Sequence, residues 1–369
     1  MNKLEKLIKD ICPNGVKYQK VGDIAVYEQP SKYIVESTKY NDDYEIPVLT
    51  AGQTFILGYT NETQEVYNAS KDDPVIIFDD FTGAFKWVDF PFKVKSSAMK
   101  IIKSKTKNYI LRYIYHLMGF INYSSNEHKR LWIGIYSEFL VPVPPLPVQA
   151  EIVRILDNFT ELTAELTAEL MARKKQYEYY INTILSFPNS IPSQKLGDTC
   201  DMKAGKSISS AEISSVKTNN DIYPCFGGNG IRGYVDKFSH DGDFPIVGRQ
   251  GALCGNIKFA SGKFYATEHA VVVKSKGAYN HRFLFYLLLS MDLNQYKSQG
   301  AQPGLSVKTL ENLWAPVPPL KEQERIASIL DRFDKLCNDI SEGLPAEIAA
   351  RQKQYEYYRD KLLTFKVKE

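Results

Sequence analysis

One long motif occurs twice in this chain and limits what the chain can fold into. The segment PVPPLPVQAEIVRILDNFTEL at residues 142–162 returns as PVPPLKEQERIASILDRFDKL at residues 316–336, shifted by 174 positions. A second motif, KQYEYY, occurs at residues 175–180 and 353–358, where the shift has become 178. A repeat of this period indicates two copies of one structural unit, and a length of 369 residues leaves room for both.

Both copies of the long motif predict an amphipathic helix. Apolar residues recur at spacings of three and four along residues 152–166 and again along residues 326–340, which indicates one buried helix face. Because proline is excluded from a helix interior, each helix should begin just after its Pro-Pro-Leu sequence. The first helix is predicted to run to about Ser186, whereas Gly-Leu-Pro at residues 343–345 predicts a break or kink in the second.

The regions before each helix predict globular domains of mixed secondary structure. Residues 20–140 and 195–314 contain short β-rich runs such as PVIIF, FPIVG and AVVVK, separated by glycine, asparagine and aspartate. One helix is expected in each region, at residues 109–118 and 282–291. Fainter similarities pair the two regions: KVGDI with KLGDT, Pro47 and Tyr59 with Pro224 and Tyr234, and Lys103-Ser104-Lys105 with Lys274-Ser275-Lys276.

Composition excludes several classes of protein. A chain with 44% hydrophobic and 24% charged residues is typical of a folded protein, and a net charge of +3 requires any basic surface to be local. The five cysteines are widely spaced and form no C-x-x-C pair, which favours a reducing, cytoplasmic setting. The charged start MNKLEKLIKD and the lack of an apolar run of about 18 residues argue against a secretion signal and a membrane span.

Taken together, the repeated motifs resemble the specificity subunits of type I restriction-modification systems, and TAELTAEL at residues 163–170 resembles the IC subfamily. The resemblance covers essentially the whole chain. It implies an α+β fold in which two target-recognition domains are joined by two long antiparallel spacer helices, coiled-coil-like, in a pseudo-two-fold internal repeat. The implied boundaries are residues 1–145 for the first domain, 146–190 for the central helix, 191–318 for the second domain and 319–369 for the C-terminal helix.

The resemblance also implies a function. Each globular domain would read one half of a bipartite DNA target, while the paired helices set the gap and dock methyltransferase subunits. The chain would be non-catalytic by itself and belong to a restriction endonuclease and adenine-N6 methyltransferase complex. The implied partners are double-stranded DNA and two methyltransferase subunits, with two restriction subunits left open. S-adenosylmethionine, ATP and Mg²⁺ are expected in partner subunits, and no cofactor or metal on this chain.

Two other functions stay open at this point: a DNA methyltransferase in its own right, and a structural coiled-coil adaptor. The sequence has no Asp/Asn-Pro-Pro-Tyr/Phe motif, no P-loop and no H-E-x-x-H helix, which counts against an enzyme. GNGIRG at residues 228–233 fits the dinucleotide pattern, but Tyr234 and Val235 favour a strand rather than the required helix, so a turn between strands is predicted. Two dissimilar globular domains count against a mere spacer.

Polar residues in glycine-punctuated loops are the candidate DNA contacts. Asparagine and glutamine suit adenine and arginine suits guanine, which favours Asn229, Arg232 and, at the expected exposed tip of GRQGALCG, Arg249 and Gln250. Plain turns with solvated side chains are the alternative. Further candidates are Thr50, Gln53, Thr82, Lys86, Asn126, His128, Lys129, Arg130, Lys206 and Gln302. Candidates for phosphate contacts, or alternatively solvated strand ends, are Lys103, Lys105, Lys107, Lys274 and Lys276.

The tyrosine-rich motifs and the TAEL segment predict protein contacts and a spacer. Tyrosine buries a large area while its hydroxyl can still hydrogen-bond, so packing between helices and docking of a methyltransferase subunit both stay open. The candidates for these roles are Gln176, Tyr177, Tyr180, Gln354, Tyr355 and Tyr358. The apolar side of the TAEL segment consists of Leu162, Leu166 and Leu170. One four-residue block adds about 6 Å of helix, so the number of blocks is predicted to set the gap between half-sites.

Overall fold

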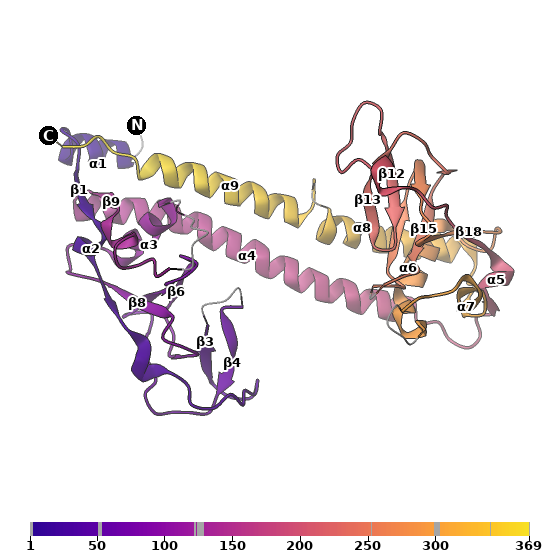
Figure 1. Ribbon diagram of the computed structural model, residues 1–369, viewed down its shortest axis with the longest axis horizontal. Helices are drawn as coiled ribbons and strands as arrows, with labels where there is room; N and C mark the ends of the chain where they lie inside the picture. The colour runs from indigo at the N-terminus through magenta and orange to yellow at the C-terminus, as the bar shows by residue number, and fades with distance from the viewer. Residues whose placement is uncertain are drawn as a thin grey trace. The chain divides into compact units, whose positions relative to one another are not determined.

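A computed structural model, shown in Figure 1, describes residues 3–50, 54–121, 123, 129–251, 253–298, 303–339 and 341–368. The chain divides into two compact units. Unit 1 comprises Met1–Glu165 together with Ile348–Glu369, and unit 2 comprises Leu166–Glu347. Both units mix helices with sheets, which confirms the predicted α+β fold class.

Unit 1 contains helices packed on short strands. Its helical elements are α1 (Lys3–Ile11), α2 (Val21–Ile24), η1 (Pro30–Tyr33), α3 (Leu111–Phe120) and η2 (Tyr136–Glu138). Its strands are β1 (Lys17–Lys20), β2 (Ala25–Glu28), β3 (Ile46–Leu49), β4 (Ile56–Thr60), β5 (Val75–Asp79), β6 (Phe85–Val88), β7 (Lys93–Val94), β8 (Met99–Ser104) and β9 (Leu140–Val143). The unit is completed by the first half of α4 (Leu146–Ile184) and by most of α9 (Leu344–Leu362).

Unit 2 also consists of helices packed on short strands. Its helical elements are α5 (Leu196–Thr199), η3 (Ser210–Glu212), α6 (His281–Ser290), η4 (Leu293–Tyr296), α7 (Val307–Glu311) and α8 (Leu320–Asn338). Its strands are β10 (Ser193–Lys195), β11 (Cys200–Ala204), β12 (Tyr223–Gly227), β13 (Gly230–Val235), β14 (His240–Asp241), β15 (Phe244–Gly248), β16 (Ile257–Ala260), β17 (Lys263–Ala266), β18 (Ala270–Ser275) and β19 (Trp314–Pro316).

The two units share one sheet topology, as the internal repeat predicts. The strand order β2-β8-β5-β6 in unit 1 corresponds to β11-β18-β15-β16 in unit 2, and the pair β1-β9 corresponds to β10-β19. Even the faint sequence similarities mark equivalent positions, because Pro47 lies opposite Tyr59 in one hairpin and Pro224 lies opposite Tyr234 in the other. In each unit that hairpin also pairs with a parallel strand, β7 or β17.

The long helices begin where the prolines predict. Helix α4 starts at Leu146 and α8 at Leu320, each the leucine of its Pro-Pro-Leu sequence, and α4 ends at Ile184. The predicted break is also present, because α8 ends at Asn338 and α9 begins at Leu344. A Cβ on Gly343 would lie 2.5 Å from the carbonyl oxygen of Lys335, so this break requires glycine.

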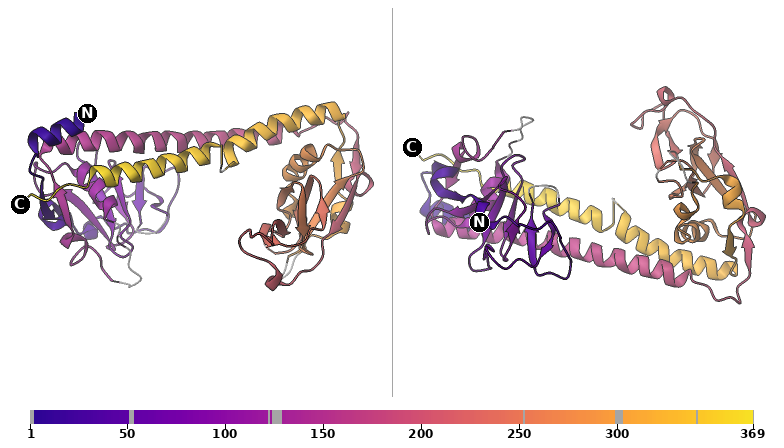
Figure 2. Two further views of the ribbon diagram at one scale, coloured as in Figure 1. Left: turned by 90° about the horizontal axis from the view of Figure 1, so that it is seen from above. Right: turned by 60° about the horizontal axis from the view of Figure 1, so that its bottom comes forward.

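Each unit packs a stretch of α4 beside a second long helix, as the views in Figures 1 and 2 agree. In unit 1 the ring of Phe159 stacks on Tyr358 of α9, 5.3 Å between centroids. In unit 2 the rings of Tyr177 and Tyr180 both lie against Phe333 of α8. Within each unit the packed faces are apolar and bury the stripe that the sequence predicts.

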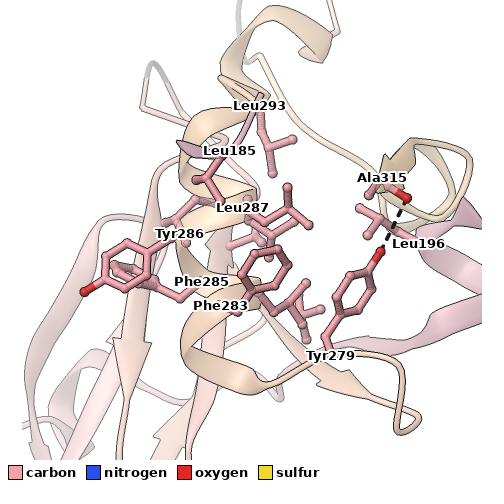
Figure 3. Close-up of a cluster of buried hydrophobic side chains, with 14 of the residues drawn as sticks. Leu185, Leu196, Tyr279, Phe283, Phe285, Tyr286, Leu287, Leu293 and Ala315 are labelled. Carbon is pink, nitrogen blue, oxygen red and sulfur yellow. Dashed lines mark hydrogen bonds between the residues drawn. The ribbon is translucent and has the colours of Figure 1, made fainter. Parts of the chain in front are cut away.

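The core of unit 2 gathers side chains of its main sheet, of α6 and of the long helices, and Figure 3 shows part of it. Helix α6 supplies six of its buried residues, including Phe283, Tyr286 and Leu287, and Leu185 just after α4 joins the same cluster. Burying one such side chain contributes about 1.5–3 kcal/mol, so the globular part and its helix are stabilised as one body.

The core of unit 1 includes the last residues of the chain. Leu363, fully buried, packs in the same cluster as Ile114 of α3 and Leu156 of α4. The tail after it forms a parallel bridge between Val367 and Val16, where the Val16 amide donates to the carbonyl of Lys366 (2.9 Å). No helix among the described residues is long and apolar enough to cross a membrane.

Candidate nucleic-acid interface and helix junctions

Loops that are distant in the sequence meet at one end of the unit 2 sheets. The turn at residues 228–229 joins β12 to β13, and the loop starting at Arg249 follows β15. They touch closely, since a Cβ on Gly248 would lie 1.8 Å from the carbonyl oxygen of Gly228. The predicted turn in GNGIRG is therefore confirmed, and glycine is required where these loops cross.

This convergence gathers several of the predicted DNA-contacting residues. Asn229, Arg232, Gln250 and Lys206 are exposed, and Asn229 Oδ1 accepts a hydrogen bond from Asn256 Nδ2 (2.5 Å). The guanidinium of Arg232 lies 3.5 Å from Ser210 Oγ. Gln302 lies outside the described residues. The fold thus brings together side chains that the sequence only predicted one by one.

Arg249 differs from its prediction as an exposed tip residue. Its side chain is half-buried, and its backbone carbonyl accepts a hydrogen bond from the Leu305 amide (2.8 Å). Gln250 beside it is exposed and forms an isolated bridge with Gly304. The segment at residues 303–305 therefore pairs with the backbone of Arg249 and Gln250, and a contact between loops so far apart cannot be read from local sequence.

Most of the predicted DNA-contacting residues that the structure describes in unit 1 are exposed or bonded within their own turn. Thr82 Oγ1 donates to Asp79 Oδ2 (2.6 Å) and accepts from the Ala84 amide (3.2 Å), so its side chain stabilises its own turn. Lys86 and Arg130 are exposed, as is Lys129, while Thr50 is half-buried. Gln53, Asn126 and His128 lie outside the described residues.

A buried ion pair beside that turn was not predicted. Asp80 and Lys100 are about 1% exposed, and Asp80 Oδ2 lies 3.4 Å from Lys100 Nζ. Lys100 also bonds Gln29, and Asp80 Oδ1 accepts from the Trp132 amide (2.8 Å). This pairing makes Asp80 a structural residue, although it follows an apolar strand in a segment that we considered for DNA contact.

Among the predicted phosphate-contacting lysines, several have partners within the chain. Lys103 lies 3.2 Å from Asp73 and over the ring of Tyr67, and Lys276 donates to the Gly197 carbonyl (2.8 Å). Both lysines lie at or just beyond strand ends with partners of their own, and a role in phosphate contact stays a prediction.

The glutamine of P-P-L-x-x-Q attaches each long helix to its globular part. Gln149 is fully buried, donates to the Pro144 carbonyl (2.8 Å) and accepts from the Ile110 amide (3.0 Å). Gln323 makes the same contacts in unit 2, with the Pro318 carbonyl (2.7 Å) and the Asn280 amide (2.8 Å). The repeated glutamine therefore ties the start of α3 or α6 to the start of α4 or α8.

The aspartate of I-L-D-x-F makes a second attachment. Asp157 accepts from Arg112 Nε of α3, and Asp331 accepts from Arg282 Nε of α6, both at 2.7 Å. Burial opposes ionisation of Asp157, but hydrogen bonds from His116 and Arg112 outweigh it and hold the pKa of that carboxyl below its usual value. We call each set of contacts, the glutamine and the arginine–aspartate pair, the junction of its unit.

A tyrosine from KQYEYY completes the junction of unit 1. The hydroxyl of Tyr355 lies 3.0 Å from His116 Nδ1, and His116 Nε2 lies 2.8 Å from Asp157 Oδ1. Because the carboxylate can only accept, this geometry assigns the proton to Nε2 and leaves Nδ1 to accept from the tyrosine. Burial raises the pKa of Tyr355 to about 12, so the tyrosine remains a donor.

The junction of unit 2 replaces this histidine with tyrosine. Tyr286 occupies the position four residues after Arg282, as His116 does after Arg112, and its hydroxyl donates to Asp331 Oδ1 (2.6 Å). Tyr177 is buried in the same unit, where burial raises the pKa of its hydroxyl. The junction of unit 1 thus contains an imidazole, whereas a tyrosine hydroxyl takes its place in the junction of unit 2.

We expect the junction of unit 1 to lose stability in mild acid because of His116. Burial lowers the pKa of His116 despite its bond to Asp157, with Arg112 and Arg359 acting in the same direction as burial. The unfolded chain then binds the proton more tightly, so this stability is complete above about pH 6.5 and is lost below it, by up to about 1.4 kcal/mol per pH unit. Hydrogen exchange of α3 between pH 7.5 and 5, with and without His116→Tyr, measures this contribution.

The chain supplies its own control for this prediction. His116→Tyr should reduce the pH dependence of α3 protection in that window, and Tyr286→His should increase the acid sensitivity of α6. Equal acid sensitivity of unit 1 before and after His116→Tyr would rule the histidine out as its source.

The remaining residues of KQYEYY divide into packed and exposed members. Tyr177 is buried, Tyr180, Tyr355 and Tyr358 are half-buried, and Gln176 and Gln354 accept from arginines on their own helices. Tyr179 and Tyr357 are 65% and 61% exposed. The predicted tyrosines thus pack within their units, and the one available for an external contact is a tyrosine that the sequence reasoning missed. In the TAEL segment Leu162, Leu166 and Leu170 are half-buried.

Comparison with known proteins gives matches along the whole chain. A sequence model of the family "Type I restriction modification DNA specificity domain" matches residues 13–173 and again residues 192–350. The type I restriction enzyme EcoR124I/EcoR124II specificity subunit of Escherichia coli is 39% identical over 421 residues, covering 99% of this chain and 97% of the relative. The EcoprrI specificity subunit of the same species is 51% identical over 221 residues, 56% of this chain and 55% of the relative.

Solved structures share the fold. The crystal structure of a type I restriction-modification S subunit from M. genitalium superposes with a TM-score of 0.66 at 14% identity, covering 95% of this chain and 96% of that one. A chain from a study of assembly of the type I system gives a TM-score of 0.56 at 16% identity, covering 95% and 98%. Each family match spans one globular part and at least part of the helix that follows it, so the sequence repeat and the structural repeat coincide.

Proposed function

We propose that this chain, which belongs to the family of type I restriction-modification specificity subunits, reads a bipartite DNA target with its two units. It is a specificity subunit and not an enzyme in its own right. In the proposal each unit recognises one half-site, and the long helices fix the number of unread base pairs between them. The recognition domains extend over residues 1–145 and 191–318, with residues 146–190 and 319–369 as spacers.

The observation that carries this proposal is one scaffold with two different sets of loop side chains. Strand order, hairpin register and junction are duplicated. At the loops, however, unit 1 holds the buried pair of Asp80 and Lys100, whereas unit 2 presents Asn229, Arg232 and Gln250. A protein that reads two unlike sequences needs this combination, because base edges are distinguished by the side chains that meet them.

The test is to produce the chain together with its cognate methyltransferase subunits and to map methylated bases by long-read sequencing. We expect one motif of two short specified blocks separated by a fixed unread gap, absent without this chain. A continuous motif, or the same methylation in its absence, would contradict the proposal.

Two methyltransferase subunits are the proposed partners, because the exposed tyrosine of KQYEYY occurs twice. Tyr179 and Tyr357 are equivalent positions of the repeat and present most of their rings to solvent. Exposed tyrosine on a rigid helix is typical of an interface hot spot. S-adenosylmethionine, ATP and Mg²⁺ would then be bound by partner subunits. The structure places no group of three or more candidate metal ligands together within its described ranges.

We expect Tyr179→Ala and Tyr357→Ala each to weaken binding of one methyltransferase subunit. Loss of a hot-spot tyrosine costs about 2 kcal/mol or more, roughly 30-fold in affinity. Native mass spectrometry would then show complexes that contain one methyltransferase subunit in place of two. Tyr296→Ala, which removes a 41% exposed tyrosine from unit 2, is the matched control. Intact assembly of both tyrosine variants at nanomolar concentration would exclude these residues as anchors.

All five cysteines are free and buried. Burial raises the pKa of Cys200 to about 11, which keeps this thiol protonated and unreactive. Free thiols suit a reducing compartment, and we propose the cytoplasm, where the DNA target would also be.

A further inference from the structure

Unit 2 concentrates unsatisfied buried polar atoms at the end of its main sheet. Arg249 Nε, Glu268 Oε2 and His269 Nδ1 are buried without a hydrogen-bond partner in the part of the chain that the structure describes. The Arg249 amide donates to the His269 carbonyl (3.0 Å), and Glu268 Oε1 lies 3.3 Å from His269 Nε2. Arg249 and His269 are thus joined through their backbones, and Glu268 and His269 through their side chains, at the loop after β15 and the turn before β18. We call these three residues the cluster.

Such a cluster requires an explanation, because buried polar atoms in native proteins are almost always hydrogen-bonded. Unit 1 follows that rule at its corresponding turn, where Asp80 Oδ2 has no hydrogen bond but is neutralised by Lys100 at 3.4 Å. In unit 2 the side chains of Glu268 and His269 remain 40% and 36% exposed. Each of these side chains thus keeps one polar atom buried without a partner and presents other atoms to solvent, where a ligand can bind it.

The surroundings of the cluster favour DNA. A Cβ on Gly228 would lie 3.3 Å from the Gln250 carbonyl and 3.5 Å from that of His269, which brings the Asn229 turn against the cluster. Arg232 extends over the backbone there, since a Cβ on Gly227 would lie 2.5 Å from its Cδ. A basic and an amide side chain thus flank the cluster, as at sites that hold phosphates and base edges.

We infer that Arg249, Glu268 and His269 are the base-reading centre of the second recognition domain, and that its ligand is the major-groove edge of a G·C pair. This inference rests on the proposed function. Arg249 donates two bonds to guanine O6 and N7, and Glu268 accepts from the N4 amino group of cytosine. His269 is a positioning residue that holds the Glu268 carboxylate. An A·T pair offers this centre a donor and a methyl group in the wrong places.

The test uses the complete complex with its methyltransferase subunits and measures methylation at the target and at every single-base variant of it. Arg249→Lys keeps the charge but loses the planar fork, and Glu268→Gln keeps the shape but adds a donor. Each variant should reduce the preference for G·C over the other base pairs by about 10- to 100-fold, at the same position of one half-site. His269→Gln should broaden that position less, and the other half-site and the gap should not change.

Glu212→Gln is the matched control, because Glu212 is an exposed carboxylate of unit 2 that bonds Lys237 (2.8 Å) and the Ser209 amide (3.2 Å). It should leave every position of the motif unchanged. Thermal unfolding checks each variant, and if Arg249→Lys destabilises the unit, the isosteric Glu268→Gln decides. Unchanged specificity, broadening at an A·T position, or a uniform loss at all sites would overturn the inference. Failure of the proposed function differs, since the wild-type complex would then show no bipartite motif.

Discussion

Insertion of a third TAEL block after Leu170 should widen the gap between the two half-sites while leaving the bases of both unchanged. Helix α4 is continuous through residues 163–170, so four added residues lengthen it by about 6 Å. One base step of DNA advances about 3.4 Å, which makes one block equivalent to one or two base pairs. Both junctions lie outside the insertion point, at Gln149 and Asp157 before it and at Gln323 and Asp331 on another helix.

The effect should be a switch of target, because sites with the original gap can no longer place both half-sites together. Methylation mapping of the wild-type chain and of chains with one or three blocks measures the gap directly. A four-residue Gly-Ser insertion at the same place is the control, since it adds length without a rigid helix and should weaken methylation at every gap. If half-site bases changed and the gap did not, the TAEL segment would not be the ruler.

Replacing Gln323 with alanine should destabilise unit 2 by about 3–5 kcal/mol, the largest loss that we expect from one side chain. Its amide donates to the Ala278 and Pro318 carbonyls (2.9 and 2.7 Å) and accepts from the Asn280 amide. Gln323 is fully buried, so alanine leaves these backbone groups without partners as well as removing the bonds. Hydrogen exchange of α6 followed by mass spectrometry reports the loss.

The repeat provides the comparison for this variant. Gln149→Ala should destabilise α3 in unit 1 by a similar amount and leave α6 protected, because the two junctions are separate. Gln295→Ala, an exposed glutamine of unit 2, should change stability by no more than about 0.5 kcal/mol. Equal protection of α6 in the Gln323→Ala and Gln295→Ala variants would mean that the junction does not depend on the buried amide.

Local signals in the sequence were sufficient for several elements of this fold. Pro-Pro-Leu located the starts of α4 and α8, and β-branched runs located β5, β15 and β18. These predictions succeed because proline geometry and apolar periodicity act over a few residues. The internal repeat predicted that the two halves are similar, and the shared strand order agrees with it.

Contacts between distant segments were not predictable in the same way. The partner of Arg112 lies 45 residues away, and the carbonyl of Arg249 accepts from the distant Leu305 amide. The sequence did contain a signal for which tyrosine of KQYEYY is buried. The apolar stripe through Leu166 and Leu170 continues at helical spacing to Tyr177 and Ile181 and does not include Tyr179. The unsatisfied atoms of Glu268 and His269 left no trace in composition or spacing.

Unit 1 consists of two separate segments of the chain, and this affects how the chain folds during synthesis. Unit 2 is one uninterrupted segment, so all of it is available before the ribosome makes residues 348–369. Unit 1 lacks most of α9 and the buried Leu363 until those residues are made, although its first strands emerge first. Folding of these two units during translation therefore reverses the usual order, in which the N-terminal domain is completed first. The nascent first unit must wait with part of its apolar surface uncovered, so a truncation after residue 347 would damage the unit that was begun earliest.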